Sequence, residues 1–140
     1  MRYFILIFLL FYSSSFAKNH NSIVFMYHRF DQDEYSATSI SSKTFEEHIL
    51  HLQKKEIDIL PLTDLVLFLK KRKKLTNKSV FITIDDAYKS FYKNGFPILK
   101  KYNLPFSVFV STDYVSNEKE SDYMSWDMLR EVSKNNGLIL

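Results

Sequence analysis

Two adjacent aspartates, Asp85 and Asp86, are the side chains in this sequence that are best suited to chemistry. They follow the apolar run 81–84, whose composition is typical of a buried strand. A strand interior cannot bury two unpaired negative charges, so we expect the strand to end at the pair. Successive strand residues point to opposite faces, so the two carboxylates can share a site only if the backbone turns between or just after them.

Given that turn, the pair suits metal-assisted hydrolysis. One carboxylate would bind a divalent cation, the other would take a proton from water that the cation activates, and the cation would offset their mutual repulsion. The alternative is structural: one aspartate caps the following helix and the other lies in a surface turn, because aspartate is common in both places. The pair alone favours neither reading.

Other candidates lie where predicted strands end. His28 follows the first strand and could face the same mouth as the acidic pair, and Tyr27 and Arg29 share that position. Asp113 and Tyr114 follow the fourth strand and could reach a substrate. For all five residues, a loop or packing role is the simpler alternative.

Three further side chains receive structural interpretations. His48 and His51 are three residues apart on one helix face, a spacing that can chelate a metal, but an amphipathic helix explains them better as a partly exposed flank. Trp126 is predicted to lie in the core rather than to stack on a sugar. His20, in the N-terminal tail, receives no role.

The N-terminus indicates export. Arg2 precedes the ten-residue apolar run 3–12, and Ser15 and Ala17 occupy the small-residue positions before a cleavage site. A membrane anchor is the alternative, but a span needs roughly 20 apolar residues. We therefore predict a signal peptide over residues 1–17, a mature chain without a membrane span, and a periplasmic, cell-envelope or extracellular location.

The mature region, residues 18–140, is long enough for one domain. It contains no cysteine, so its core must hold the fold without disulfides. The net charge of +3, or +2 once Arg2 is subtracted, is too small to indicate nucleic acid binding. The basic run 70–74 is interpreted as a solvated helix end, with contact to an anionic polymer or lipid as the alternative.

Strand and helix patterns alternate along the mature chain. A polar segment over residues 28–42 is predicted to be a loop. Thr44 with Glu47, Thr63 and Ser125 are predicted helix caps. Gly95 and Pro97 predict a kink or a helix in two pieces. The predicted strands are 23–27, 57–60, 79–84, 106–110 and 138–140, and the predicted helices are 44–55, one from 63, one reaching 101 after the acidic pair, and one from 125 that ends at 135–137 with a left-handed cap. This order predicts an α/β fold with a parallel sheet, either open and doubly wound or the first part of a β/α barrel.

Several segments, in order, resemble the polysaccharide deacetylase family, also called the NodB homology domain or carbohydrate esterase family 4. The run Phe81-Ile82-Thr83-Ile84-Asp85-Asp86-Ala87 resembles the family's Thr-Phe-Asp-Asp-Gly motif. The other similar segments are 24–30, which contains Tyr-His-Arg, 44–62, 105–110, and 124–137, which contains the tryptophan of a helix that precedes the family's histidine motif. The resemblance implies the N-terminal portion of a distorted (β/α) barrel.

The resemblance also implies a reaction. Asp85 would be the general base and Asp86 a ligand to a divalent metal, usually zinc. The reaction would remove N-acetyl groups from an amino-sugar polymer, with a histidine protonating the leaving amine. The same residues would serve an acetyl ester hydrolase of this family, and the sequence does not separate amide from ester.

Two departures from the family limit these expectations. Ala87 replaces the family's glycine, and a positive φ at that position would cost alanine about 1 to 2 kcal/mol. The family's His-x-x-x-His ligands are expected after Leu140, so we expect a 140-residue fragment alone to be inactive. Two other classes remain open: a non-catalytic glycan-binding or vestigial protein, and a phosphoacceptor receiver domain, which the signal peptide disfavours.

Overall fold

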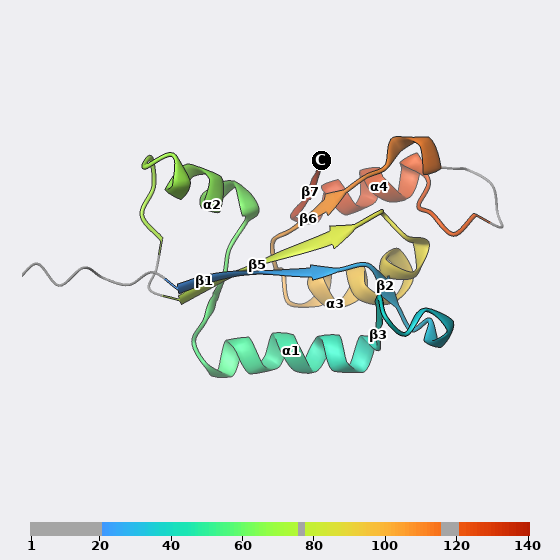
Figure 1. Cartoon of the computed structure of the whole chain (residues 1–140), viewed down its shortest axis with the longest axis horizontal. Coiled ribbons are helices and arrows are strands. Elements are labelled where there is room, and N and C mark those ends of the chain that lie inside the picture. Colours follow the sequence, from blue (N-terminus) through green and yellow to red (C-terminus); the bar gives the residue numbers. More distant parts are fainter. Residues whose placement is uncertain (1–20, 76–77, 116–120) are drawn as a thin grey trace, which may run out of the picture.

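The computed structural model describes residues 21–75, 78–115 and 121–140, so the predicted signal peptide and His20 lie outside the described residues. Figure 1 shows the arrangement of the elements. The strands are β1 (Asn21–Tyr27), β2 (Arg29–Phe30), β3 (Ser39–Ile40), β4 (Asp58–Ile59), β5 (Lys78–Asp85), β6 (Phe106–Phe109) and β7 (Gly137–Ile139). The helices are α1 (Ser42–Lys54), α2 (Leu62–Leu69), α3 (Phe96–Lys101) and α4 (Trp126–Ser133), with short helical segments η1 (Asp33–Tyr35), η2 (Phe91–Gly95) and η3 (Thr112–Tyr114).

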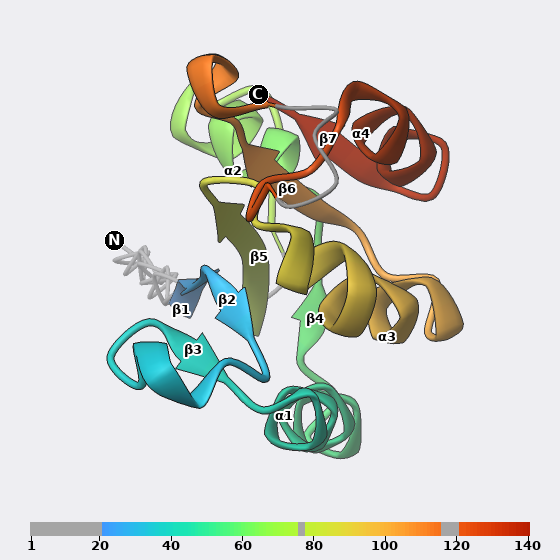
Figure 2. The ribbon, with the colours of Figure 1, turned by 90° about the vertical axis from the view of Figure 1, so that its right-hand side faces the viewer.

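The main sheet is parallel, as the alternation of strands and helices predicts. Its strand order is β1-β5-β6-β7, and β4 pairs with the beginning of β5. β1 follows β5 over its whole length, from the pair Asn21↔Lys78 to the pair Tyr27↔Ile84. The carboxyl ends of β1, β5 and β6 therefore lie at one edge of the sheet, and this edge carries the candidate site (Figures 1 and 2).

The two faces of the sheet have different surroundings. Figure 2 shows α1, α3 and α4 along one side of the sheet. Ile82 and Ile84 of β5 point to that side and belong to the hydrophobic core. Because successive strand residues alternate, Thr83 and Asp85 point to the opposite face. The core is closed by buried side chains from these helices and strands, among them Phe30, Phe45, Ile49, Phe91, Leu99, Phe106, Val108, Leu129 and Val132.

Helix α1 begins earlier than predicted. Its N-cap is Ser41, whose Oγ accepts a hydrogen bond from the backbone nitrogen of Thr44 at 3.0 Å. The predicted cap was Thr44, paired with Glu47. Ser41 and Thr44 both carry a hydroxyl that can cap a helix, and Ser41 comes three residues earlier. The helix therefore begins after Ser41.

The caps of the other helices give a mixed result. Ser125 is confirmed as the N-cap of α4, since its Oγ accepts from the backbone nitrogen of Met128 at 3.3 Å. Thr63 does not cap α2, because the helix already begins at Leu62 after the N-cap Pro61. The proline fixes the backbone at this start without a side-chain hydrogen bond.

The basic run 70–74 follows the end of α2 at Leu69, and its residues are exposed. This agrees with the predicted solvated helix end. One of its members also has a structural contact: Lys73 Nζ lies 2.5 Å from Oδ2 of Asp64, which is buried in α2. The basic run is therefore exposed to solvent, and Lys73 also forms an ion pair with α2.

The polar segment 28–42 is more ordered than the predicted loop. It contains η1 and the strands β2 and β3, which pair in parallel over two residues. The reason is Phe30, which is fully buried and contacts the rings of Phe45 and Phe91 at centroid distances of 5.0 and 5.6 Å. One large apolar side chain within a polar segment anchors it to the core.

The predicted helix in two pieces near Gly95 is confirmed, because the π-helical η2 ends there and α3 follows directly. The left-handed cap predicted at the end of α4 is confirmed. Asn136 takes the left-handed conformation, with φ of 62°, whereas Gly137 begins β7. Gly137 is needed for space, since a Cβ there would lie 2.6 Å from Cγ1 of Val132.

Trp126 is not a core residue as predicted. It is the first residue of α4 and its side chain is 44% exposed. The core positions of this helix are instead Leu129 and Val132, three and six residues later on the same face. The apolar pattern correctly predicts that Leu129 and Val132 are buried. Trp126 lies in the first turn of the helix, where its side chain is exposed.

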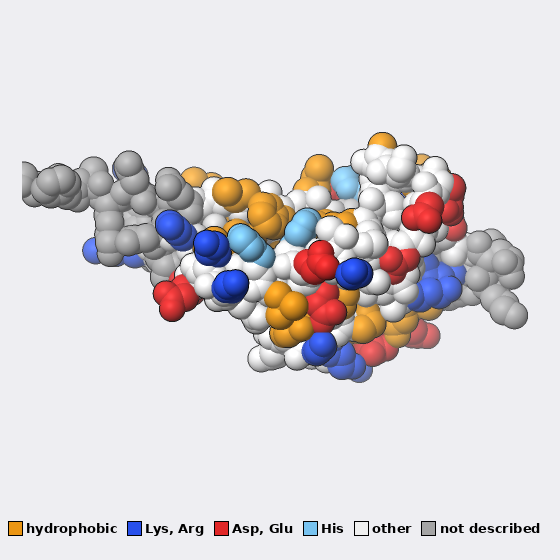
Figure 3. Space-filling view, turned by 90° about the horizontal axis from the view of Figure 1, so that it is seen from below, with side chains coloured by type: hydrophobic (Ala, Val, Ile, Leu, Met, Phe, Trp, Pro, Cys, Tyr) orange, Lys and Arg blue, Asp and Glu red, His pale blue; other side chains and the backbone are white. Residues whose placement is uncertain are grey.

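The face seen in Figure 3 carries charges of both signs. Acidic and basic side chains alternate there, together with histidines. In the ranges that the structure describes, no helix has the length and apolarity required to cross a membrane.

Candidate active site at the end of β5

The acidic pair lies at a sharp turn. β5 ends at Asp85, and the next two residues take left-handed conformations, with φ of 64° at Asp86 and 54° at Ala87. The predicted end of the strand is therefore confirmed. The turn removes the strand alternation that would send the two carboxylates to opposite faces of the sheet.

A second segment of the chain holds this turn. The backbone nitrogen of Met124 donates to the carbonyl oxygen of Ala87 at 2.9 Å, and that of Lys89 donates to the carbonyl oxygen of Asp122 at 2.6 Å. Tyr88 and Tyr123 form an antiparallel bridge between these bonds. Ala87 is also almost fully buried, so the left-handed turn is fixed by both hydrogen bonds and packing.

His28 is the predicted candidate that the structure brings to the pair. Its Nε2 lies 4.0 Å from Oδ2 of Asp85, and the two side chains are 24% and 29% exposed. This separation is too long for a hydrogen bond, but it is within the range of an ion pair when the imidazole is protonated. Because Tyr27 pairs with Ile84, the residues that follow them meet at the same edge.

Tyr27 is not brought to the pair. It lies on the helix-covered face of the sheet, where its ring packs against Phe45 at 4.8 Å and its hydroxyl lies 3.2 Å from Nδ1 of His48. Burial raises the pKa of Tyr27 to about 12. Its predicted lining role is not supported, because strand alternation directs Tyr27 and His28 to opposite faces.

Arg29 is buried beside the turn. Its guanidinium lies 3.9 Å from the ring centroid of Tyr35 and 3.6 Å from that of Tyr88. Its Nη1 donates to Oε1 of Gln32 at 3.1 Å and lies 3.7 Å from Oδ2 of Asp122. Such a set of partners holds the side chain in one position, so Arg29 shapes the wall of the site.

Asp113 and Tyr114 lie in η3, after β6 and toward the same edge of the sheet. Asp113 is exposed. The ring of Tyr114 stacks on that of Tyr123, with 4.9 Å between centroids and 15° between planes. The structure therefore links Tyr114 to the turn through Tyr123 and Tyr88, two residues that sequence reasoning did not single out. The position of Tyr88, two residues after the acidic pair, is a sequence signal, whereas nothing local marks Tyr123.

The histidines of α1 are not part of this site. His48 contacts Tyr27 on the helix-covered face, and both His48 and His51 are exposed. Their predicted interpretation as an exposed helix flank agrees with the structure.

The donors at the turn suit a divalent cation in type. Asp85 and Asp86 are two consecutive carboxylates at the end of β5, and both residues are half-buried. They fall short in number: the described residues contain no group of three or more His, Cys, Asp or Glu side chains that could hold a metal. A catalytic zinc site normally uses three protein ligands. The acidic pair alone therefore does not complete a zinc site among the described residues.

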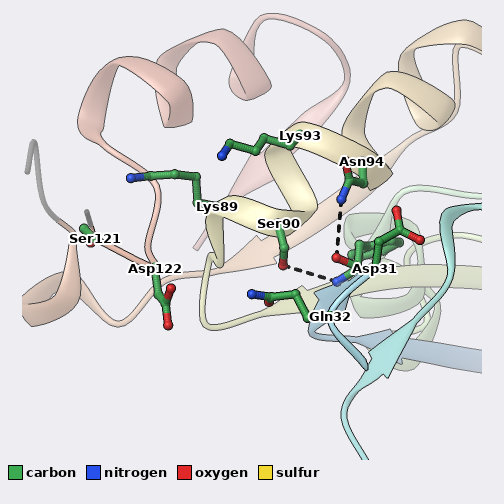
Figure 4. A pocket seen from close by; sticks show the side chains of 9 residues that line it. Asp31, Gln32, Lys89, Ser90, Lys93, Asn94, Ser121 and Asp122 are labelled. Atoms are coloured by element: carbon green, nitrogen blue, oxygen red, sulfur yellow. Dashed lines mark hydrogen bonds between the residues drawn. The ribbon is translucent and has the colours of Figure 1, made fainter. Parts of the chain in front are cut away.

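A polar cavity of about 330 Å³ lies next to the turn (Figure 4). Its walls come from β2 and the residues after it, from the helical segment after the acidic pair, and from residues 121–122. Ser90 Oγ accepts from the backbone nitrogen of Phe30 at 3.2 Å, and Asn94 Nδ2 donates to the carbonyl oxygen of Phe30 at 3.4 Å. These bonds fix one wall, while Lys93 extends along the cavity beside it.

Comparison with known proteins shows which family the chain and its fold resemble. A family model described as polysaccharide deacetylase matches residues 72–139. Poly-beta-1,6-N-acetyl-D-glucosamine N-deacetylase from Staphylococcus aureus is 34% identical over 112 residues, which are 79% of this chain and 38% of the relative. The protein of the same name from Staphylococcus epidermidis is 30% identical over 79 residues, 56% of this chain and 27% of the relative.

Solved structures give the same result. IcaB from Ammonifex degensii matches with a TM-score of 0.76 and 28% identity, over 86% of this chain and 52% of that chain. A de-N-acetylase from Aggregatibacter actinomycetemcomitans shares the fold, with a TM-score of 0.72 and 20% identity, over 84% of this chain and 53% of that chain.

Fold and site together define a parallel α/β protein with paired carboxylates at a strand end, in the manner of the (β/α) barrel deacetylases. The chain belongs to the polysaccharide deacetylase family. This family is metal-dependent in general, and the membership excludes the phosphoacceptor alternative. The chain spans 38% of the length of the Staphylococcus aureus relative that it matches.

Proposed function

We propose that this chain supplies the acidic half of the active site of an exported, metal-dependent deacetylase that removes N-acetyl groups from an amino-sugar polysaccharide. The observation that carries the proposal is the left-handed turn at Asp86, directly after Asp85, whose own carboxylate lies 4.0 Å from Nε2 of His28. The names of the Staphylococcus relatives favour a β-1,6-linked N-acetylglucosamine polymer as substrate.

In this proposal each residue has one role. Asp86 would be a ligand of the divalent cation, most simply zinc, which when bound polarises the acetamide carbonyl and acidifies water. Asp85 accepts the proton of the attacking water as the new carbon–oxygen bond forms. His28 donates a proton to the amide nitrogen as the carbon–nitrogen bond breaks, which releases acetate and the free amine. The proton on Asp85 then returns to solvent and His28 regains a proton from solvent, which restores both groups.

Export is part of the proposal because the substrate would lie outside the cytoplasm. It is supported by the signal-peptide pattern of residues 1–17. Accumulation of a chain shortened by those residues outside the cytoplasm would test it.

The catalytic proposal is tested with a chimera, because one coordination position does not make a zinc site. Residues 21–140 would replace the matched region of the Staphylococcus aureus relative, and acetate release from a β-1,6-linked N-acetylglucosamine oligomer would be measured with added Zn²⁺. We expect turnover that falls at least about 100-fold in Asp86→Ala and in Asp85→Asn. If the two variants fold and each releases acetate as fast as the unsubstituted chimera, the proposed roles of Asp85 and Asp86 are refuted.

The shortage of metal ligands among the described residues also favours a second candidate, a glycan-binding protein without turnover. Binding of the same oligomer that is unchanged by a chelator, together with no acetate release from the folded chimera, would select it. The family also includes ester hydrolysis, and release of acetate from an O-acetylated but not an N-acetylated sugar would indicate that reaction.

A further inference from the structure

Five side chains form a continuous stack beside the acidic pair, which we call the tyrosine ladder: Tyr35, Arg29, Tyr88, Tyr123 and Tyr114. The Arg29 guanidinium lies between the rings of Tyr35 and Tyr88, at 3.9 and 3.6 Å from their centroids. Tyr88 and Tyr123 stack at 5.0 Å and 28°, and Tyr123 and Tyr114 stack at 4.9 Å and 15°. Each inner member contacts two others, so the five side chains form one unit.

The ladder is attached to the catalytic edge at two points. Tyr88 is two residues after Asp86, and its backbone bridges to Tyr123. Arg29 directly follows His28, which reaches Asp85. A ligand on the ladder would therefore lie close to the groups that we propose for catalysis.

The ends of the ladder are exposed, Tyr88 and Tyr123 are half-buried, and Arg29 is buried. Tyr35 is 41% exposed and Tyr114 is 56% exposed, while Arg29 is only 8% exposed. One side of the Tyr114 ring rests on Tyr123, so its orientation is already set. An aromatic ring that is held in place loses little conformational freedom when a ligand packs on it.

The ladder connects to the polar cavity of Figure 4 through two neighbours of Arg29. Gln32 and Asp122 both contact Arg29 and also line this cavity. Asp31, Lys93 and Asn94 add further hydrogen-bonding groups to its wall. An exposed aromatic ring suits the apolar C–H face of one pyranose unit, and a polar cavity suits the hydroxyl groups of another unit of the same chain.

We propose that the ladder is a platform on which the polysaccharide lies during the reaction. One sugar ring stacks on the outer face of Tyr114, and another unit of the same polymer is hydrogen-bonded in the cavity beside Arg29. The identity of the polymer rests on the proposed function, but stacking on Tyr114 does not require an acetyl group.

The test measures binding rather than turnover. The purified chain is titrated calorimetrically with β-1,6-linked glucosamine dimers and pentamers, each in N-acetylated and free-amine form. We expect the pentamer to bind more tightly than the dimer. Tyr114→Ala and Tyr114→Leu should weaken pentamer binding by about 3- to 10-fold in both forms and leave dimer binding unchanged. Tyr114→Phe, which keeps the ring, should bind like the parent chain. Leu69→Ala, which trims a side chain that is 70% exposed on α2, is the surface control.

The outcomes separate this proposal from the deacetylase proposal. Pentamer affinity that is unchanged in folded Tyr114→Ala and Tyr114→Leu overturns the platform, whatever the chimera shows. An equal loss for dimer and pentamer also overturns it, because it would indicate a general structural effect. Pentamer binding that depends on the Tyr114 ring supports the platform even if the chimera releases no acetate, a result that would count only against the catalytic roles.

Discussion

His28 Nε2 lies 4.0 Å from Asp85 Oδ2, although the two residues end different strands. The parallel pairing of β1 with β5 produces this meeting, because Tyr27 and Ile84 are register partners and the next residue of each strand reaches the same edge. The gap is longer than a hydrogen bond. Catalytic contacts are often long without substrate and shorten in the reacting complex, so this separation is compatible with an acid and a base that act on one amide.

The first prediction concerns this pair. In the chimera described above, His28→Gln should lower acetate release by about 100- to 10,000-fold, the usual range for loss of a general acid. His48→Gln is the matched control, because His48 contacts Tyr27 on the opposite face of the sheet. Equal rates for the two glutamine variants would contradict the role of His28, and circular dichroism would verify that both are folded.

The second prediction concerns Ala87, which stands where the family has glycine. Its φ of 54° costs alanine about 1 to 2 kcal/mol, and glycine would remove this strain. The Ala87 methyl is buried, however, so its loss costs about 0.8 kcal/mol, and glycine adds about 0.4 to 1 kcal/mol of unfolded-state entropy. The terms nearly cancel, and Ala87→Gly should change the free energy of unfolding by less than about 1 kcal/mol.

Ala87→Val supplies the contrast. A β-branched side chain is strained at positive φ and would also overfill the buried position, so we expect a loss of more than about 2 kcal/mol in urea unfolding. Stabilisation of 2 kcal/mol or more by Ala87→Gly would show that the buried methyl contributes little and that the strain dominates.

The sequence predicts the parallel sheet and the end of β5 well, because both depend on local patterns. Two consecutive carboxylates are costly to bury inside a strand, so the strand has to end where the apolar run meets them. The left-handed conformation of Asp86 is this end. Exposure of Trp126 could not be read in the same way, because the face that a helix buries depends on which neighbours it meets. Phe30 shows the same limit: only the tertiary structure reveals that one phenylalanine in a polar segment is fully buried.

The aromatic wall of the site could not be predicted, since its parts are distant in sequence. Tyr35, Tyr88 and Tyr123 come together through Arg29 and a single backbone bridge. No periodicity or motif in one segment records such a contact. The sequence places Tyr114 near the correct edge, but its stacking partner becomes visible only in the structure.

The third prediction concerns Gly95, where the helix after the acidic pair changes from η2 to α3. Its φ of −89° is open to any residue, so the constraint is space. A Cβ there would lie 2.8 Å from ring atoms of both Phe30 and Phe91, which are fully buried and cannot move aside. Gly95→Ala should lower the free energy of unfolding by about 1 to 3 kcal/mol in urea titration.

Lys93→Ala is the control for this substitution, because Lys93 is exposed in the same helical segment. It should change stability by less than about 0.5 kcal/mol. If Gly95→Ala were equally mild, Phe30 and Phe91 would have to repack at little cost, and the tight contact of β2 with η2 would not be a requirement of the fold.

The fourth prediction concerns the dependence of stability on pH through Glu131. Tyr92 donates its hydroxyl proton to Oε2 of Glu131 at 2.5 Å, which joins η2 to α4. This hydrogen bond, helped by the charge of Lys100, lowers the pKa of Glu131. A lowered pKa in the folded state gives a contribution to stability that is present above the ordinary glutamate pKa of about 4.3 and is lost as the pH falls through the lower folded value.

Glu131→Gln should therefore lower the melting temperature at pH 7, and the difference from the parent chain should shrink as the pH falls below about 4. The same hydrogen bond raises the pKa of Tyr92, so its own contribution is present at neutral pH and is lost only as the pH rises beyond about 10. The two limits leave neutral pH as the window in which both residues stabilise the fold. Tyr92→Phe separates this bond from a general charge effect: with the hydroxyl absent, Glu131→Gln should cost clearly less at pH 7. An equal cost in both backgrounds would assign the effect to Lys100 instead of Tyr92.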